Sequence, residues 1–436
     1  MATSSELIPY ISSHFADVSK REVSPGEADL ILNSIPRELL EEALCGNEDA
    51  NSFNELAVDI LRTLLPSCSK DTVNKHVTLL PLLVERLKAS EDQNSISDLS
   101  ECVICLSASG GRDCSDPLHQ TVDALSAFCV KNSQEFPFTG IIERITESMR
   151  VLRTFDEHCG DTSYELSSRH DWPKDVLTLL DRFLRTRTEM VGDDTRFRMF
   201  RLVKEVVETI GTDWFAVNPS LLVLLVHLVV VQSRICLDKH DTTDPQDIAI
   251  CFHILEMAIR CVEESSTIED SVATRMATSI REAAFFAAEF WVGAEEQGQH
   301  LPKEVKLVLY RFLLCFLAIG GAEMLPSSLV ESCSPLLLDV FKREVECGNH
   351  TAALLFLPYL HVLPKLSDNV LTLIVDLALS QCSLSNWKEI DDDAASCLES
   401  LSSRVDFYNE ESLASARSRV KQLKNGSKLH EVLAKL

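Results

Sequence analysis

The chain has 436 residues, of which 45% are hydrophobic but only 6% are aromatic, so its core is built mainly from aliphatic side chains. Such side chains suit helix-on-helix packing, and 14 glycines and 15 prolines are few for a chain with many tight β-turns. The net charge of −26 repels phosphate backbones, which argues against nucleic acid as a partner.

The N-terminus carries no targeting signal that we recognise. No cationic region leads into an apolar one, as it does in a secretory signal peptide, and Ala2 occupies the position where myristoylation requires glycine. Most of the 15 cysteines lie in apolar runs, as expected for buried thiols in a reducing compartment. These features predict a cytoplasmic protein.

A rhythm of helix, short loop and helix begins in the first hundred residues. Leu56, Ile60 and Leu64 recur at three- and four-residue spacing, which predicts a helix over residues 53–65. Ser69 is suited to cap a second helix, which we expect to run to about residue 88. Further helices are expected at 98–107, 121–131, 139–155, 172–187 and 196–210, with the polar loop 156–171 between them.

The second half continues in the same way, and no stretch alternates with the period of a strand. The apolar run 221–231 is shorter than the roughly 20 residues of a membrane span and contains His227. We interpret it as part of a central helix that is buried on all sides. Helices are expected at 217–239, 245–264, 268–293, 301–319, 325–347, 351–363, 366–381, 389–404 and 408–435, the last of them broken near Asn425-Gly426.

Helix pairs return about every 40 residues, which is the armadillo/HEAT length. In such arrays each pair buries its apolar face against its neighbours and leaves a long surface for binding. The sequence therefore predicts an all-α, armadillo/HEAT-like α-solenoid of stacked antiparallel helix pairs. We expect one array over residues 1–436, with a soft break at 156–171 and a basic C-terminal helix at 408–436. A compact irregular helical domain is the alternative.

Four segments carry a family resemblance. They are RLVKEVVETIGTDWF (201–215), LLVLLVHLVVVQSRICLD (221–238), ICFHILEMAIRCVEES (250–265) and SIREAAFFAAEFWV (279–292). Their order is similar to that of the neurochondrin (norbin) family, in which a helix closes on Gly-Ser/Thr-Asp-Trp and an aliphatic helix follows. The resemblance is most specific over residues 197–292.

The resemblance implies a cytoplasmic adaptor of neuronal cell bodies and neurites, with a role in neuronal signalling and neurite outgrowth. It also implies protein partners, namely the cytoplasmic tails of G-protein-coupled receptors and calmodulin-dependent kinase II. Such an adaptor captures peptide segments on its surface and catalyses no covalent chemistry. The alternative is a generic HEAT/armadillo scaffold in transport or complex assembly.

Candidate chemistry is sparse. Cys102 and Cys105 form a CxxC pair, with Cys114 and His119 following, but this spacing is common by chance and lies in an apolar helical run. No nucleophile-elbow, P-loop or dinucleotide-binding motif occurs. We therefore predict no metal, no cofactor and no catalytic residues, with an undetected enzyme as the third class of function.

A basic segment at residues 182–204 stands out in this acidic chain. If its cations share one face, they suit an acidic or phosphorylated peptide, because the arginine fork binds carboxylate and phosphate with two bonds. The alternative is that they solvate helix faces and pair with the chain's own carboxylates. The candidate residues are Arg182, Arg185, Arg187, Arg196, Arg198, Arg201 and Lys204.

The C-terminal stretch 417–436 is also basic, with six cations against Glu431 alone. An apolar stripe that includes Leu413 and Val420 lies on the same expected helix. This element can dock on the acidic body as a terminal cap, touch an anionic membrane peripherally, or contact a partner. Its candidate residues are Arg417, Arg419, Lys421, Lys424 and Lys428.

Overall fold

The structure is a computed structural model. It describes residues 23–45, 51–132, 138–156, 169–186, 191–264, 268–357, 370–381, 387–401, 410–421 and 427–435. Every regular element in these ranges is an α-helix or a 3₁₀ helix, and none is a strand. Contacts divide the chain into two compact units, Met1–Val217 and Asn218–Leu436. The prediction of one array over residues 1–436 stays a prediction.

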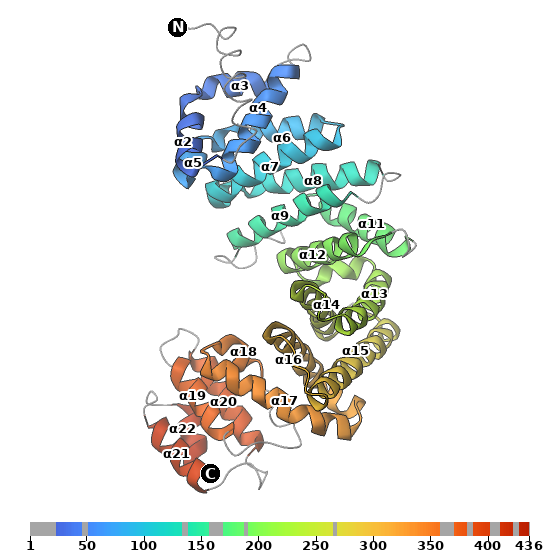
Figure 1. Cartoon of the computed structure of the whole chain (residues 1–436), viewed down its shortest axis with the longest axis vertical. Helices are drawn as coiled ribbons and strands as arrows, with labels where there is room; N and C mark the ends of the chain where they lie inside the picture. The colour runs from blue at the N-terminus through green and yellow to red at the C-terminus, as the bar shows by residue number, and fades with distance from the viewer. Residues whose placement is uncertain are drawn as a thin grey trace. The chain divides into compact units, whose positions relative to one another are not determined.

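The first unit is built from two rows of stacked helices (Figure 1). Helices α6, α8 and α11 follow one another in one row, and α7, α9 and α12 in the other. The elements are α2 (Pro25–Ser34), α3 (Arg37–Cys45), α4 (Asn51–Leu64), η2 (Leu65–Ser67), α5 (Lys70–Lys75), η3 (Val77–Leu79), α6 (Leu80–Ala89), α7 (Gln93–Gly110), η4 (Gly111–Cys114), α8 (Ser115–Lys131), α9 (Thr139–Asp156), α11 (Trp172–Arg185), α12 (Asp193–Ile210) and η7 (Thr212–Val217).

The second unit repeats this arrangement. Helices α13, α15 and α17 form one row, α14 and α16 pack beside them, and α19 to α22 close the end of the chain. The elements are α13 (Pro219–Asp238), α14 (Pro245–Glu264), α15 (Asp270–Glu296), α16 (Lys303–Ala318), η8 (Gly321–Met324), α17 (Ser327–Glu346), α18 (His350–Leu354), α19 (Val370–Gln381), α20 (Trp387–Leu401), α21 (Glu410–Val420) and α22 (Lys428–Lys435). The predicted fold class, an α-solenoid of helix pairs, is thereby confirmed.

The helix expected to run from Ser69 to about residue 88 is broken, so that prediction was wrong. Its first part, α5, ends at the buried residue His76, whose backbone (φ −101°, ψ 0°) is not helical. Helix α6 begins a few residues later, with Pro81 in its first turn. Proline is tolerated there because its missing N–H has no partner to lose. Ser69 does cap α5, because its side chain accepts from the Thr72 N–H.

Other boundaries also differ from the expected ones. The N-terminal helices α2 and α3 were not predicted. The segment 408–435, which was expected to break near Asn425-Gly426, does form two helices, α21 and α22. Parts of the loop 156–171 and of the helices expected at 172–187, 351–363, 366–381, 389–404 and 408–435 lie outside the described residues.

The best-matched segment folds as a helix end and an aromatic junction. Gly211 adopts φ +90°, and its N–H bonds the Val207 carbonyl at 2.8 Å, which ends α12. Trp214 and Phe215 are buried directly after it, with ring centroids 4.8 Å apart. The Trp214 Nε1–H donates to the Pro173 carbonyl at 2.9 Å, so this junction ties α11 to the end of α12.

Aspartates on one helix cap the start of a later helix in both units. Asp123 on α8 accepts from the backbone N–H groups of Asp171 (3.0 Å) and Trp172 (2.8 Å), where α11 begins. Asp391 on α20, which is buried, accepts from the N–H of Lys428 at 2.7 Å, where α22 begins. These bonds satisfy amides that have no partner within their own helix.

Candidate functional site

The basic segment 182–204 is divided between two helices. Arg182 and Arg185 end α11, Arg187 lies outside the described residues, and the remaining cations belong to α12. The helices α11 and α12 stand in different rows of the first unit, so the segment does not lie on a single helix face.

The α11 arginines are engaged by their own surroundings. Arg185 Nε lies 2.7 Å from an oxygen of Asp181, four residues earlier on the same exposed face. Arg182 donates to the carbonyls of Cys129 (3.4 Å) and Val130 (3.5 Å) at the end of α8. The pair with Asp181 is of the exposed kind that contributes only about 0.3–0.5 kcal/mol on a helix.

On α12 the first two arginines are paired as well. Arg196 lies 2.5 Å from Asp193, on the preceding turn. Arg198 bonds Asp194 at 2.8 Å and also pairs with Glu143 of α9. The alternative interpretation of the segment, pairing with the chain's own carboxylates, describes these residues.

Several charged side chains converge between α9 and α12. The Glu205 side chain, only 4% exposed, is 3.1 Å from Arg150 Nε, 2.9 Å from Arg153 Nη1 and 3.2 Å from Lys204 Nζ. Glu208 pairs with Lys204 at 2.6 Å and with Arg153. Three cations thus surround two carboxylates, which leaves one positive charge in excess. We call these five residues the Glu205 cluster.

Opposing effects set the ionisation of Glu205. Burial raises its pKa, but the bonds and charges of Arg153, Lys204 and Arg150 outweigh burial, so the pKa lies below its usual value. The carboxylate therefore stays ionised and holds its cations in place. The side chain of Arg150 is still 50% exposed and that of Arg153 33%, so both side chains remain partly open to solvent.

Sequence reasoning missed Arg150 and Arg153, because neither belongs to a run of basic residues. They are three residues apart on α9, which places them on one helix face. That spacing was the available signal. Their partner Glu205 lies about 50 residues further on, and only the packing of α9 against α12 brings it close. Arg201 lies on α12 too, half-buried.

The C-terminal basic residues lie on helices that dock on the body. Arg419 pairs with Asp376 of α19 at 2.6 Å, and Lys428 pairs with Asp392 of α20 at 2.7 Å. Arg417 donates to the Leu433 carbonyl at 3.0 Å, which joins α21 to α22. Lys421 is exposed, and Lys424 lies outside the described residues. The apolar residues that α21 buries are Leu413, Ala416 and Val420.

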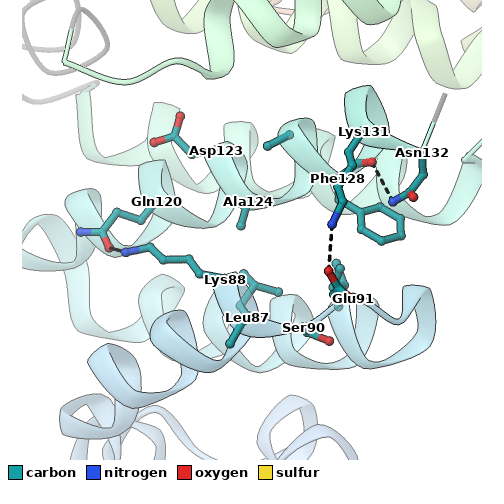
Figure 2. Close-up of a pocket in the computed structure, with 13 residues that line it drawn as sticks. Leu87, Lys88, Ser90, Glu91, Gln120, Asp123, Ala124, Phe128, Lys131 and Asn132 are labelled. Carbon is teal, nitrogen blue, oxygen red and sulfur yellow. Dashed lines mark hydrogen bonds and ion pairs between the residues drawn. The ribbon is translucent and has the colours of Figure 1, made fainter.

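A groove of about 700 Å³ lies between α6 and α8 of the first unit (Figure 2). Buried Leu87, Ile96 and Phe128 form part of its lining. Its volume falls in the range of small-molecule sites, but its wall is only partly apolar.

Two polar contacts cross this groove, as the dashed lines in Figure 2 show. Lys88 Nζ reaches Gln120 Oε1 at 2.8 Å, and Lys131 Nζ reaches Glu91 Oε1 at 2.8 Å. The side chains of Lys131 and Glu91 are 67% and 82% exposed, so water screens their attraction. The two contacts can therefore break to admit a ligand. Because the rim carries both positive and negative side chains, it does not favour ligands of either charge.

The cysteines and the histidine of the CxxC region do not converge. Cys102 is buried with Sγ 3.8 Å from the Val58 carbonyl, whereas His119 Nδ1 accepts from Trp172 Nε1 at 3.2 Å. Burial, and then His170, lower the pKa of His119 to about 4, so it is neutral at physiological pH. Among the described residues no group of three or more His, Cys, Asp or Glu could hold a metal ion.

The apolar helix α13 has 20 residues, so by length and composition it could cross a membrane. The apolar run 221–231, considered alone, was too short to indicate this. A core helix meets the same criterion, and 61% of its apolar window is buried, with α14 and α15 packed against it. The prediction of burial on all sides was wrong. Val231 is 55% exposed, and Leu224 and Ile235 are 37% exposed each.

Rows of stacked helices with charged and apolar surfaces open to partners define the class of helical repeat scaffolds. The model of the neurochondrin family matches residues 118–355, more than half of the chain. The chain therefore belongs to the neurochondrin family, and the resemblance seen in residues 197–292 is confirmed.

Solved structures resemble the chain only loosely. A crystal structure of an engineered protein matches with a TM-score of 0.46 and 13% identity, covering 96% of this chain and 93% of its own. A circular tandem repeat protein with novel repeat topology matches with a TM-score of 0.23 and 13% identity, covering 95% of each chain. No curated protein matches the sequence.

Proposed function

We propose that this chain is a non-enzymatic scaffold that binds acidic or phosphorylated segments of other proteins at the Glu205 cluster. The observation that supports it is the excess of cations around Glu205 and Glu208, together with the exposure of Arg150. Family membership and the helical repeat fold support the scaffold role.

Recognition at the cluster rests on the arginine side chains. A planar guanidinium group offers paired donors to a carboxylate or phosphate, and Arg150 spends only part of its donors on Glu205. The buried carboxylate orients Arg150 and Arg153 before a ligand arrives, which reduces the entropy lost on binding. The net charge of −26 repels acidic ligands at long range, so binding depends on contacts within the cluster.

We further propose, from the family, a role in neuronal signalling and neurite outgrowth in the cytoplasm of neuronal cell bodies and neurites. The proposed partners are receptor cytoplasmic tails and calmodulin-dependent kinase II. A generic scaffold in transport or complex assembly is the alternative, and neural enrichment of expression separates the two. For the C-terminal basic helices we propose the role of a terminal cap, which the buried stripe on α21 supports.

The test compares two exposed arginines on different helices. A glutamate-rich peptide and its phosphoserine counterpart are titrated against the full chain by fluorescence anisotropy. Arg150→Ala should weaken binding about tenfold or more, because it removes a charge-assisted contact. Arg185→Ala is the control, since Arg185 is 62% exposed on α11 and lies outside the cluster.

The control should change affinity by no more than about twofold, within the range of an exposed charge. Denaturation curves establish that both variants are folded. Equal losses for the two variants would mean that general electrostatics drives binding, and failure of both peptides to bind the unmodified chain would refute the proposal.

A further inference from the structure

Helix α13 leaves an apolar stripe uncovered, whereas most of its other residues are buried. Leu224, Val231 and Ile235 are exposed, with half-buried Leu228 between them. Their spacing of four, three and four residues places them in one narrow sector of the helix, about 17 Å long. We call these four residues the α13 stripe. A helix that is apolar all round is normally buried all round, so the stripe lacks a partner among the residues that the structure describes.

Helix α15 packs beside α13 and carries an exposed aromatic side chain of its own (Figure 1). Its Phe285 is 36% exposed, and the adjacent Phe286 lies under the Arg234 guanidinium group of α13, 5.4 Å from Cζ to the ring centroid. Arg234 also donates to the Glu282 carbonyl at 3.4 Å. These contacts fix α13 against α15, so the apolar surface is held in place before any partner binds.

The stripe ends in negative charge. Asp238 follows Ile235 in the same sector of α13, and the turn after it contains Asp241 and Asp244, with Asp241 88% exposed. Residues 238–247 hold four aspartates against one lysine, and we call this segment the acidic turn. The carbonyl groups at the end of α13 add a partial negative charge of the same sign.

We propose that the α13 stripe and the acidic turn bind an amphipathic α-helix of a partner protein that carries basic residues at one end of its apolar face. An apolar stripe three turns long matches the apolar face of a helix, and the turn attracts the basic end. The chain's net charge of −26 also favours a basic ligand.

Two other occupants fit less well. An anionic membrane would meet the acidic turn with charge of the same sign. A second copy that packed its α13 antiparallel on this one would bring no cation to the turn, because α13 carries no lysine or arginine before Arg234. This surface lies in the second unit, so the inference does not depend on the Glu205 cluster.

The probe is a synthetic amphipathic peptide of about 18 residues, with leucines at helical spacing and lysines at one end. A matched peptide carries glutamates in place of the lysines. Each is titrated against the full chain by fluorescence anisotropy, and the lysine peptide should bind at least about tenfold more tightly. Its affinity should fall as salt is raised.

Two variants separate the apolar and the charged parts of the site. Val231→Asp should weaken the lysine peptide about tenfold or more, whereas Met324→Asp, a control at an exposed apolar residue of the same unit, should not. The double variant Asp241→Lys and Asp244→Lys should reverse the preference toward the glutamate peptide, a result that an unfolded protein would not give.

The proposal is overturned if the two peptides bind equally, or if Val231→Asp leaves the lysine peptide unaffected. Binding to vesicles containing phosphatidylserine that Val231→Asp abolishes, with no peptide binding, would make the face a membrane surface instead. A concentration-dependent dimer that Val231→Asp dissociates would identify a second copy as the occupant. Either result would replace the proposal.

Discussion

Each of the two units buries a glutamate between neighbouring helices of one row. The pKa of the glutamate is lowered in the first unit and raised in the second. Glu205 on α12 faces α9, and Glu256 on α14 faces Arg311 of α16 at 3.0 Å. Their side chains are similarly covered, with 4% and 7% exposed. Yet the pKa of Glu205 lies below its usual value, whereas burial raises that of Glu256.

The difference lies in how many cations offset burial. Arg153, Lys204 and Arg150 all contact Glu205, whereas Arg311, itself 43% exposed, is the cation that contacts Glu256 most directly. One half-solvated arginine in contact, helped by the more distant charges of His253 and Arg260, therefore does not overcome the desolvation of this buried carboxylate. In the first unit the ionised Glu205 holds three cations in place. In the second unit Glu256 is more readily protonated than Glu205.

Replacing Glu205 with glutamine should have the largest effect. Arg150, Arg153 and Lys204 would face one another with only Glu208 to compensate, and we expect a loss on the order of 3 kcal/mol in the free energy of unfolding. Urea denaturation measures it, with Glu85→Gln as a control, because Glu85 is 73% exposed. A loss no greater than that of the control would show that the cluster contributes nothing to stability.

Replacing Glu256 with glutamine should cost less than about 1 kcal/mol in the same denaturation experiment. The folded state already disfavours the ionised form of Glu256, and Arg311 remains partly solvated when its partner is lost. If this variant proves as damaging as Glu205→Gln, the number of cations does not explain the difference between the two sites.

The pH dependence of stability is the subtlest expected difference. The folded pKa of Glu205 is lowered, so its contribution is present above the usual value of 4.5 and is lost as pH falls through the folded pKa. The folded pKa of Glu256 is raised, so its contribution is present below 4.5 and is lost as pH rises through the folded pKa.

Thermal midpoints between about pH 3 and pH 7 test these signs. Glu205→Gln should reduce the loss of stability that occurs as pH falls below 4.5. Glu256→Gln should remove the decline in stability that occurs as pH rises above 4.5. Parallel curves for both variants and the unmodified chain would contradict the assignment.

The fold was largely predictable from the sequence because helical periodicity is local. Residues 245–264 were predicted as the helix that α14 forms, and Gly211 ended α12 as its position suggested. The broken helix around His76 was not predictable in the same way. Apolar spacing continues through that break, although Pro81 in the first turn of α6 was an available signal of a new helix start.

The candidate sites were less predictable because they depend on contacts between distant residues. A cluster of basic residues in the sequence pointed to the segment 182–204. In the structure this segment is divided between two helices, and several of its arginines form ion pairs with nearby aspartates of their own helix. Arg150 meets Glu205 only through the packing of α9 on α12. The exposed face of α13 could not be predicted either, because the apolar composition of this helix suggested that it is buried on all sides.

The aspartate that caps a distant helix has a consequence for how the chain opens. The first turn of α22 is bonded to Asp391, which reaches it only while α20 is folded. Unfolding of α20 therefore deprives α22 of its cap, and the backbone amides of both helices should become exposed to solvent exchange together. Bonds of this kind join neighbouring repeats into larger cooperative units, so local fluctuations spread over pairs of helices instead of fraying one helix at a time.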